Sequence, residues 1–162
     1  MENLINDFGD AEDTLKDKYL TFVLGIQTYG LEIKYITEII SMQPITQIPE
    51  MPEYVRGIIN LRGRVIPLID IRLRFNMQKI EHTKKTSIIV VDLKDKSIGL
   101  IVDYVKEVIA LTEDTKVDST AIKNNFNNRY IQGFGKINNE ILLLLNCEKL
   151  LSQSELDDFS IL

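Results

Sequence analysis

Residues 53–72 read EYVRGIINLRGRVIPLIDIR. Two apolar runs, residues 55–61 and 65–69, flank the short polar segment Arg62-Gly63-Arg64. Runs of this length that are rich in Ile and Val, with a glycine-containing turn between them, are typical of two paired β-strands. The segment therefore predicts a β-hairpin whose turn presents Arg62 to the outside.

The end of this segment predicts how the hairpin stops. Pro67 has no backbone N–H to donate to a neighbouring strand, so we expect an edge position or a bulge there. Asp70 can cap a short helix over residues 71–75. Three further hairpins are expected, from residues 19–24 with 29–33, 88–91 with 98–102, and 130–137 with 141–145. Their expected turns are Gln27-Thr28, Lys94-Asp95-Lys96 and Asn138-Asn139, and Asn146 is expected to cap a last helix over residues 147–151.

The chain repeats part of its own sequence, which indicates two similar halves. Segment 30–40 lies on segment 99–109 with five identical residues in eleven ungapped positions. Chance similarity among hairpins rich in Ile and Val is the alternative to duplication. A second shift, of 76 residues, places Gly57 on Gly133, Val65 on Ile141, Leu68 on Leu144 and Asp70 on Asn146.

A duplication gives each half about five short strands, too few to bury both faces of an open sheet. We therefore expect a mainly β fold of two five-stranded β-barrels with a few short helices. The two halves would cover roughly residues 19–75 and 86–151, with the chain crossing between the barrels near their ends. Residues 152–162 are expected to form a C-terminal tail or a helical extension.

Negative charge is concentrated at the N-terminus. The 162-residue chain has a net charge of −5, all of it in residues 1–17, and the rest has 18 basic and 18 acidic residues. Residues 1–17 are therefore expected to be a flexible acidic tail and not a signal peptide. A neutral folded part has no field to attract DNA or an anionic membrane. The longest apolar run, residues 141–145, is also far too short to span a bilayer.

The sequence offers no set of residues for catalysis. His82 is the only histidine and lies in a polar segment, where a solvated side chain is the simpler interpretation. The single Cys147 excludes an internal disulfide and the usual zinc sites, and it fits the reducing cytoplasm. Residues 133–135 lack the third glycine of a phosphate-binding loop and fit a strand bulge better. We therefore expect a protein that is not an enzyme and uses no cofactor or metal.

Five of the six arginines lie within 19 residues: Arg56, Arg62, Arg64, Arg72 and Arg74. Such a cluster could bind nucleic acid through its phosphates. The neutral charge of the folded part favours a protein interface instead, because the planar guanidinium pairs with carboxylates and is common at binding hot spots. Solvation or pairing within the chain is the simpler alternative for each arginine taken singly. Arg62, at its glycine-bounded turn, is the exception.

Segment 53–72 strongly resembles the signature of the CheW family of bacterial chemotaxis coupling proteins. That signature is Gly-apolar-apolar-Asn-Leu-Arg-Gly, then an apolar strand containing Pro, then Asp-Leu/Ile-Arg. Residues 57–63 and Asp70-Ile71-Arg72 match it here, and the similarity extends over residues 19–151. The resemblance implies two SH3-like barrels, in agreement with the repeat.

The resemblance also implies a function. It is that of a non-enzymatic cytoplasmic adaptor, recruited to membrane receptor arrays through its partners without inserting into the membrane. The partners would be the cytoplasmic tip of transmembrane chemoreceptors and the regulatory domain of the histidine kinase CheA, with self-association or rings that include this domain. The alternatives are an adaptor of a non-flagellar chemosensory system and, from another class, nucleic-acid binding through the arginine cluster.

The expected sites divide between the two partners. Glu38 and Arg62 match family positions tied to partner coupling, and Gly57 matches one where bulk disturbs docking, although a bulge needed only for folding also explains Gly57. A receptor-binding groove between the barrels is expected to contain Ile33, Ile36, Glu38, Arg62, Val102, Val105 and Val108, of which Ile33, Val102 and Val108 fit a core role equally well. The kinase-binding surface is expected to contain Gly57, Asn60, Leu61, Arg62, Gly63, Gly133 and Gly135.

Overall fold

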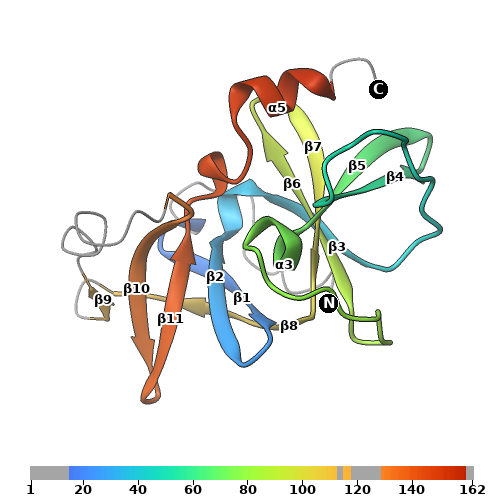
Figure 1. Cartoon of the computed structure of the whole chain (residues 1–162). Coiled ribbons are helices and arrows are strands. Elements are labelled where there is room, and N and C mark those ends of the chain that lie inside the picture. Colours follow the sequence, from blue (N-terminus) through green and yellow to red (C-terminus); the bar gives the residue numbers. More distant parts are fainter. Residues whose placement is uncertain (1–14, 113–114, 118–128, 160–162) are drawn as a thin grey trace.

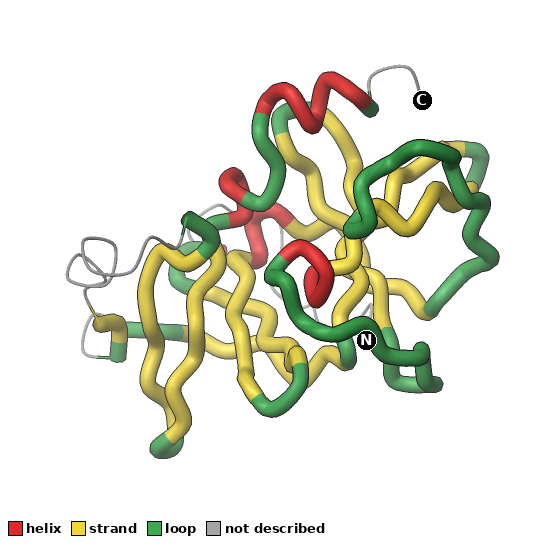
Figure 2. Tube along the Cα trace, viewed as in Figure 1, coloured by secondary structure: helices red, strands yellow, loops and turns green. Residues whose placement is uncertain are grey.

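The structure is a computed structural model that describes residues 15–112, 115–117 and 129–159 (Figure 1). The expected acidic tail therefore lies, up to residue 14, outside the described residues, as does the end of the C-terminal segment. Strands predominate along the chain trace and the helices are short (Figure 2), so the expected mainly β class is confirmed. The described helices are α3 (Ile71–Arg74), α5 (Gln153–Asp158) and the 3-10 helices η1 (Ile33–Tyr35) and η2 (Cys147–Lys149).

The strands form two mixed sheets. Sheet A has the order β8-β1-β2-β11-β10-β9, with β1 (Lys18–Leu24), β2 (Gln27–Glu32), β8 (Tyr104–Ala110), β9 (Lys116–Val117), β10 (Ile131–Ile137) and β11 (Glu140–Leu145). Sheet B has the order β3-β6-β7-β5-β4, with β3 (Ile36–Ser41), β4 (Val55–Leu61), β5 (Arg64–Asp70), β6 (Ser87–Leu93) and β7 (Lys96–Val102).

The two sheets follow one plan, with strands exchanged between the halves of the chain. β6, β7 and β8 are the counterparts of β1, β2 and β3, and β10 and β11 are those of β4 and β5. Replacing each strand by its counterpart turns the order of sheet B into that of the first five strands of sheet A. Each sheet therefore draws on both ranges 19–75 and 86–151, because the chain crosses between the sheets after β2 and again after β7.

A glycine lies in each sheet where a strand of one half pairs in parallel with a strand of the other. β2 and β11 pair in parallel with Gly30 opposite Leu144, and β7 and β5 pair in parallel with Gly99 opposite Leu68. A Cβ atom on Gly30 would lie 3.0 Å from the Leu144 side chain, and one on Gly99 would lie 2.5 Å from Leu68. The missing side chain leaves room for the leucine of the neighbouring strand, which accounts for glycine at both places.

Two-residue turns close three of the hairpins. Both residues have positive φ in Arg62-Gly63, in Lys94-Asp95 and, as predicted, in Asn138-Asn139. This backbone geometry matches the right-handed twist of paired strands. The first hairpin differs from the prediction, because its turn is Gly25-Ile26, with Gly25 at φ 63°, and Gln27-Thr28 already belong to β2.

The predicted edge position of Pro67 is wrong. β5 lies between β4 and β7, so it has a neighbour on each side. The parallel pairing with β7 begins one residue later, at Leu68, and Pro67 therefore has no paired residue in β7. The bulge of this hairpin lies in the partner strand, where the register of β4 shifts between Val55 and Gly57.

The helix caps divide into one correct and one wrong prediction. The Asp70 carboxylate accepts from the backbone N–H of Leu73 at the start of α3, at 3.4 Å, as predicted. The side chain of Asn146 makes no capping hydrogen bond at η2. The last helix, α5, begins further along, where Ser152 and Glu155 form a capping box.

Backbone pairs join the two edges of each sheet. In sheet B, the chain leaves edge strand β3 and returns to the opposite edge, where Thr46 and Ile58 exchange two backbone hydrogen bonds of 2.9 Å. In sheet A, the chain leaves edge strand β8 and forms β9, which pairs with β10. The same closing step in both sheets agrees with the barrels expected from the repeat.

The core has a part inside each sheet and a larger part between them. Within sheet B, six buried residues that include Ile66 and Leu68 form one cluster, and within sheet A four that include Leu142 and Leu144 form another. The largest cluster takes residues from both sheets and also receives Leu156 of α5 and, directly after it, Phe159. Both sheets therefore share one core. In the described part of the chain, no helix is long and apolar enough to cross a membrane.

Candidate partner-binding surfaces

The turn between β4 and β5 presents an ion pair at one end of sheet B. Arg62 has φ 52° in this turn, and its guanidinium donates to both carboxylate oxygens of Glu38 in β3. The Asn60 side-chain oxygen holds the turn by accepting from the backbone N–H of Gly63 at 2.9 Å. Arg62 is 67% exposed and Glu38 only 19%, so the partly buried carboxylate orients an exposed guanidinium.

The predicted kinase-binding residues fall on two separate sheets. Gly57, Asn60, Leu61, Arg62 and Gly63 lie together in β4 and its turn in sheet B. The other two lie in β10 of sheet A, where the register shifts between Ile131 and Gly133 as it does at the counterpart bulge of β4; they are Gly133 and Gly135. Five of the seven predicted kinase-binding residues therefore lie together, and the other two lie on the corresponding strand of the other sheet.

Most of the residues predicted for the receptor groove are buried. Ile33, Ile36, Val102 and Val105 are 1–7% exposed and belong to the shared core, and Val108 is partly buried against it. Glu38 and Arg62 lie at the end of sheet B and do not line the groove between β3 and β8. The buried side chains shape the junction between the sheets from within.

A groove of about 500 Å³ lies between edge strand β3 of sheet B and edge strand β8 of sheet A. We call it the inter-sheet groove. Val105 is the only residue of the predicted set that lines it. The groove is mostly apolar, with two lysines from the segment before β6; its lining residues are Ile39, Ile40, Ser41, Lys84, Lys85, Thr86, Ser87, Tyr104 and Val105.

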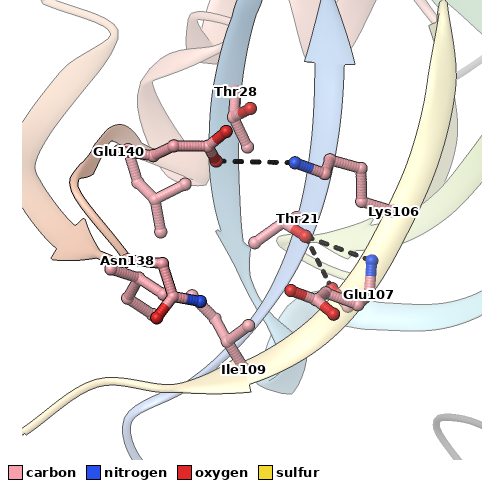
Figure 3. A pocket seen from close by; sticks show the side chains of 9 residues that line it. Thr21, Thr28, Lys106, Glu107, Ile109, Asn138 and Glu140 are labelled. Carbon is pink, nitrogen blue, oxygen red and sulfur yellow. Dashed lines mark hydrogen bonds and ion pairs between the residues drawn. The ribbon is translucent and has the colours of Figure 1, made fainter.

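A smaller cavity of about 240 Å³ opens at the end of sheet A, beside the turn Asn138-Asn139 (Figure 3). Lys106 and Glu140 reach across it, with 3.5 Å between ammonium and carboxylate. The Thr21 hydroxyl donates to the carbonyl of Glu107 at 2.8 Å and accepts from its N–H at 3.1 Å, which holds the bulge between β1 and β8. This end corresponds, residue by residue of the repeat, to the Glu38–Arg62 end of sheet B.

The five clustered arginines do not form one basic surface. Each contacts a different part of the molecule. Arg72, for example, donates to both oxygens of Asp103 at 2.7 and 3.0 Å, in the corner between β7 and β8. The remaining partners are Asp70 for Arg56, Glu38 for Arg62, Ser97 for Arg64 and Glu155 for Arg74.

The C-terminal helix is fixed by a polar contact that the sequence analysis did not single out. Arg74 donates to both Glu155 oxygens at 2.7 and 2.8 Å and lies over the rings of Tyr54 and Tyr130. Burial raises the pKa of the Glu155 carboxyl, but hydrogen bonds from Ser152, Tyr54 and Arg74 outweigh burial and hold it at about 2. The Ser-x-x-Glu capping box in the sequence was the signal for this helix.

The described residues contain no group of three or more His, Cys, Asp or Glu side chains that could hold a metal ion. Sequence comparison places the chain in a known family, because the profile of the CheW-like domain matches residues 18–155. The chain belongs to the CheW family. This is a family of scaffolding proteins without enzymatic activity.

Several proteins of this family are similar to the chain over most of its length. The chemotaxis protein CheW of Klebsiella aerogenes is 32% identical over 146 residues, covering 90% of this chain and 88% of that protein. The chemotaxis protein CheW of Helicobacter pylori is 33% identical over 144 residues, covering 89% and 86%. The crystal structure of the scaffolding protein TtCheW from Thermoanaerobacter tengcongensis matches with a TM-score of 0.76 and 34% identity, over 83% of this chain and 91% of that one.

Proposed function

We propose that this CheW-family chain is a chemotaxis adaptor that couples transmembrane chemoreceptors, the methyl-accepting chemotaxis proteins, to the histidine kinase CheA. The family match over residues 18–155 carries this proposal. Holding receptor and kinase in one fixed geometry would let the receptor control the kinase without chemistry by the adaptor itself. Such a protein would work in the cytoplasm and reach receptor arrays through its partners.

The inter-sheet groove is the proposed docking site for the receptor tip. Its apolar lining, from Ile39 and Ile40 on one sheet and Val105 on the other, can bury the apolar side of a helical hairpin. Buried apolar area supplies affinity at about 25 cal/mol per Å². The shared core beneath the groove, with Ile36 and Val102, keeps its two walls in register.

The two sheet ends are the proposed docking sites for the CheA regulatory domain. That domain is itself CheW-like, so the two ends offer pseudo-equivalent surfaces to a partner of related shape. The exposed Val65 at the end of sheet B and its counterpart, the exposed Ile141 at the end of sheet A, give each end an apolar centre. Two different ends on one molecule make a head-to-tail contact, which closes into rings of this chain alone or with the kinase domain.

Two other functions are weighed against this one. An adaptor of a non-flagellar chemosensory system would use the same surfaces, and the receptor and kinase that bind decide between the two. Nucleic-acid binding is disfavoured, because the clustered arginines have partners in different elements and the folded part is neutral.

The test is binding of the full chain to a receptor cytoplasmic fragment and to a CheA regulatory domain, with Arg62→Ala and Arg129→Ala as the pair of variants. Arg129 is exposed and lies before β10, at the end of that strand opposite to its turn. We expect Arg62→Ala to weaken binding of at least one partner about tenfold, as removal of an exposed interface arginine does. Arg129→Ala should leave both affinities unchanged.

The stability of Arg62→Ala decides how a loss of binding is interpreted. Because Arg62 is largely exposed, the melting temperature of the Arg62→Ala variant should stay within about 3 °C of that of the wild type. A large drop would make Arg62 a structural residue. Absence of wild-type binding to both partners would sink the adaptor proposal and leave only the fold.

A further inference from the structure

We propose that Lys84 and Lys85 make the inter-sheet groove selective for a receptor helix that carries carboxylates beside its apolar stripe. This inference rests on the proposed docking of a receptor in the groove. It concerns two residues of the polar segment before β6, outside segment 53–72 that resembles the family signature.

The two lysines are the only charged side chains in the lining of the groove. Both are exposed. Among the residues that the structure describes, neither has a carboxylate within ion-pair distance, whereas all five clustered arginines have a polar partner of their own. Within the described residues, the groove thus combines apolar walls with two ammonium groups that have no carboxylate beside them.

Lys85 also links the two walls of the groove. Its ammonium lies 5.6 Å from the centre of the Tyr104 ring, although Lys85 precedes β6 of sheet B and Tyr104 begins β8 of sheet A. An exposed cation–ring contact is weak. A carboxylate from a partner could therefore draw Lys85 away from Tyr104 and uncover the ring for apolar contact.

The position of these two positive charges favours a partner that carries negative charge beside its apolar face. A helix seated along Ile39 and Val105 would present its flanking residues to the side where the polar segment before β6 lies. Acidic residues there would meet Lys84 and Lys85, and basic residues would be repelled. The charge pair Glu38–Arg62 is already matched within the chain and lies outside the groove, so it cannot supply this selection.

The experiment compares the full chain with the double variant Lys84→Glu/Lys85→Glu for binding to a receptor cytoplasmic fragment. Two reversed charges at exposed positions should weaken binding about tenfold at low salt. Raising the salt from about 0.05 M to about 0.5 M should reduce this difference to about twofold, because screening acts on exposed charges. A fragment whose acidic residues at the tip are changed to Lys should prefer the variant.

The control is Lys79→Glu/Lys136→Glu, which changes the net charge equally at exposed lysines outside the groove. It should bind like the wild type. If the wild type binds and the Lys84/Lys85 variant binds equally well, the inference is wrong while the adaptor proposal stands. If the wild type does not bind, the adaptor proposal fails first. Sedimentation of the chain alone is run alongside, and self-association that depends on both lysines would overturn a receptor as the occupant.

Discussion

The ends of the two sheets share a backbone and differ in chemistry. Both end in a hairpin whose two turn residues have positive φ, Arg62-Gly63 in sheet B and Asn138-Asn139 in sheet A. At the end of sheet B, Arg62 is fixed on Glu38 and stands out from the surface. At the end of sheet A, the counterpart of Arg62 is an asparagine, and a cavity of about 240 Å³ is crossed by the pair Lys106–Glu140 (Figure 3).

The difference shows how one duplicated scaffold can present two surfaces. The strand order, the bulges in β4 and β10 and the closing backbone pairs are retained in both halves. Exposed side chains at the ends of the two sheets differ, as Arg62 and its counterpart Asn138 do, and these set the charge and shape that a partner meets. Unlike ends suit the proposed head-to-tail contact, because one end can dock on the other, different end of a related molecule.

The largest expected effect is a loss of stability when the bulge of β4, a backbone feature that both sheets have, is disturbed. Gly57 has φ 138°, and a Cβ atom there would lie 2.3 Å from the backbone oxygen of Thr46, which closes sheet B. Gly57→Ala should therefore lower the free energy of unfolding by about 3 kcal/mol or more, through overlap and backbone strain. Urea unfolding measures the loss. Hydrogen exchange should show it first in sheet B, while sheet A keeps its protection.

Gly63→Ala is the matched control for this change. Gly63 also has positive φ, at 84°, but no atom lies within 4 Å of the added Cβ. It should cost only about 1 kcal/mol, the strain of the backbone conformation alone. Equal losses for Gly57 and Gly63 would mean that the contact with Thr46 does not hold sheet B closed.

The sequence predicted the parts of this comparison that depend on local pattern. Alternating Ile and Val runs and turn residues such as Asn138-Asn139 located the hairpins, and the repeat indicated two matching units. A crossing was expected near the ends of the barrels, but which strands are exchanged was not predictable, because a strand pattern does not say which neighbour the strand pairs with. Pro67 was misjudged for the same reason, since its tolerance depends on where the pairing with β7 begins.

The candidate site was predictable where a turn displays a residue and not where surfaces meet across the molecule. Arg62 and Glu38 were singled out and do form a pair at the end of sheet B. The inter-sheet groove depends on the distance between edge strands β3 and β8, which no local pattern specifies. Lys84 and Lys85 follow His82 in a polar segment whose pattern does not indicate a binding surface, and most of the apolar residues expected at the groove are buried in the shared core.

A smaller effect concerns the contact that holds α5 against both sheets. The pKa of Glu155 is about 2, well below its ordinary value, so its charged form stabilises the folded chain above pH 4.5. That stabilisation is lost as the pH falls from about 4.5 to about 2. Because Glu155 is partly exposed, solvent screening reduces this effect, and we expect the free energy of unfolding to fall by about 1 kcal/mol over this pH range. In the Glu155→Gln variant, the free energy of unfolding should depend less steeply on pH between 4.5 and 2. Urea titration at several pH values measures this slope.

Glu81→Gln serves as the control for the loss of one carboxylate, because Glu81 is exposed in the segment before β6 and lies away from α5. It should leave the slope between pH 4.5 and 2 as in the wild type. An unchanged slope for Glu155→Gln would show that the contact with Arg74 does not tie α5 to the fold. A changed slope joined to loss of protection in both sheets would show that α5 stabilises the two ends together.

The smallest expected effect compares the two ion pairs directly. Glu38 is 19% exposed beside Arg62, whereas Lys106 and Glu140 are 34% and 61% exposed. Double-mutant cycles with Ala should give a coupling free energy of about 0.5–1 kcal/mol for Glu38–Arg62 and below about 0.3 kcal/mol for Lys106–Glu140, because exposed pairs are screened by water. High salt should remove the second coupling and leave part of the first. A stronger coupling at Lys106–Glu140 would reverse the comparison and make the end of sheet A the more ordered surface.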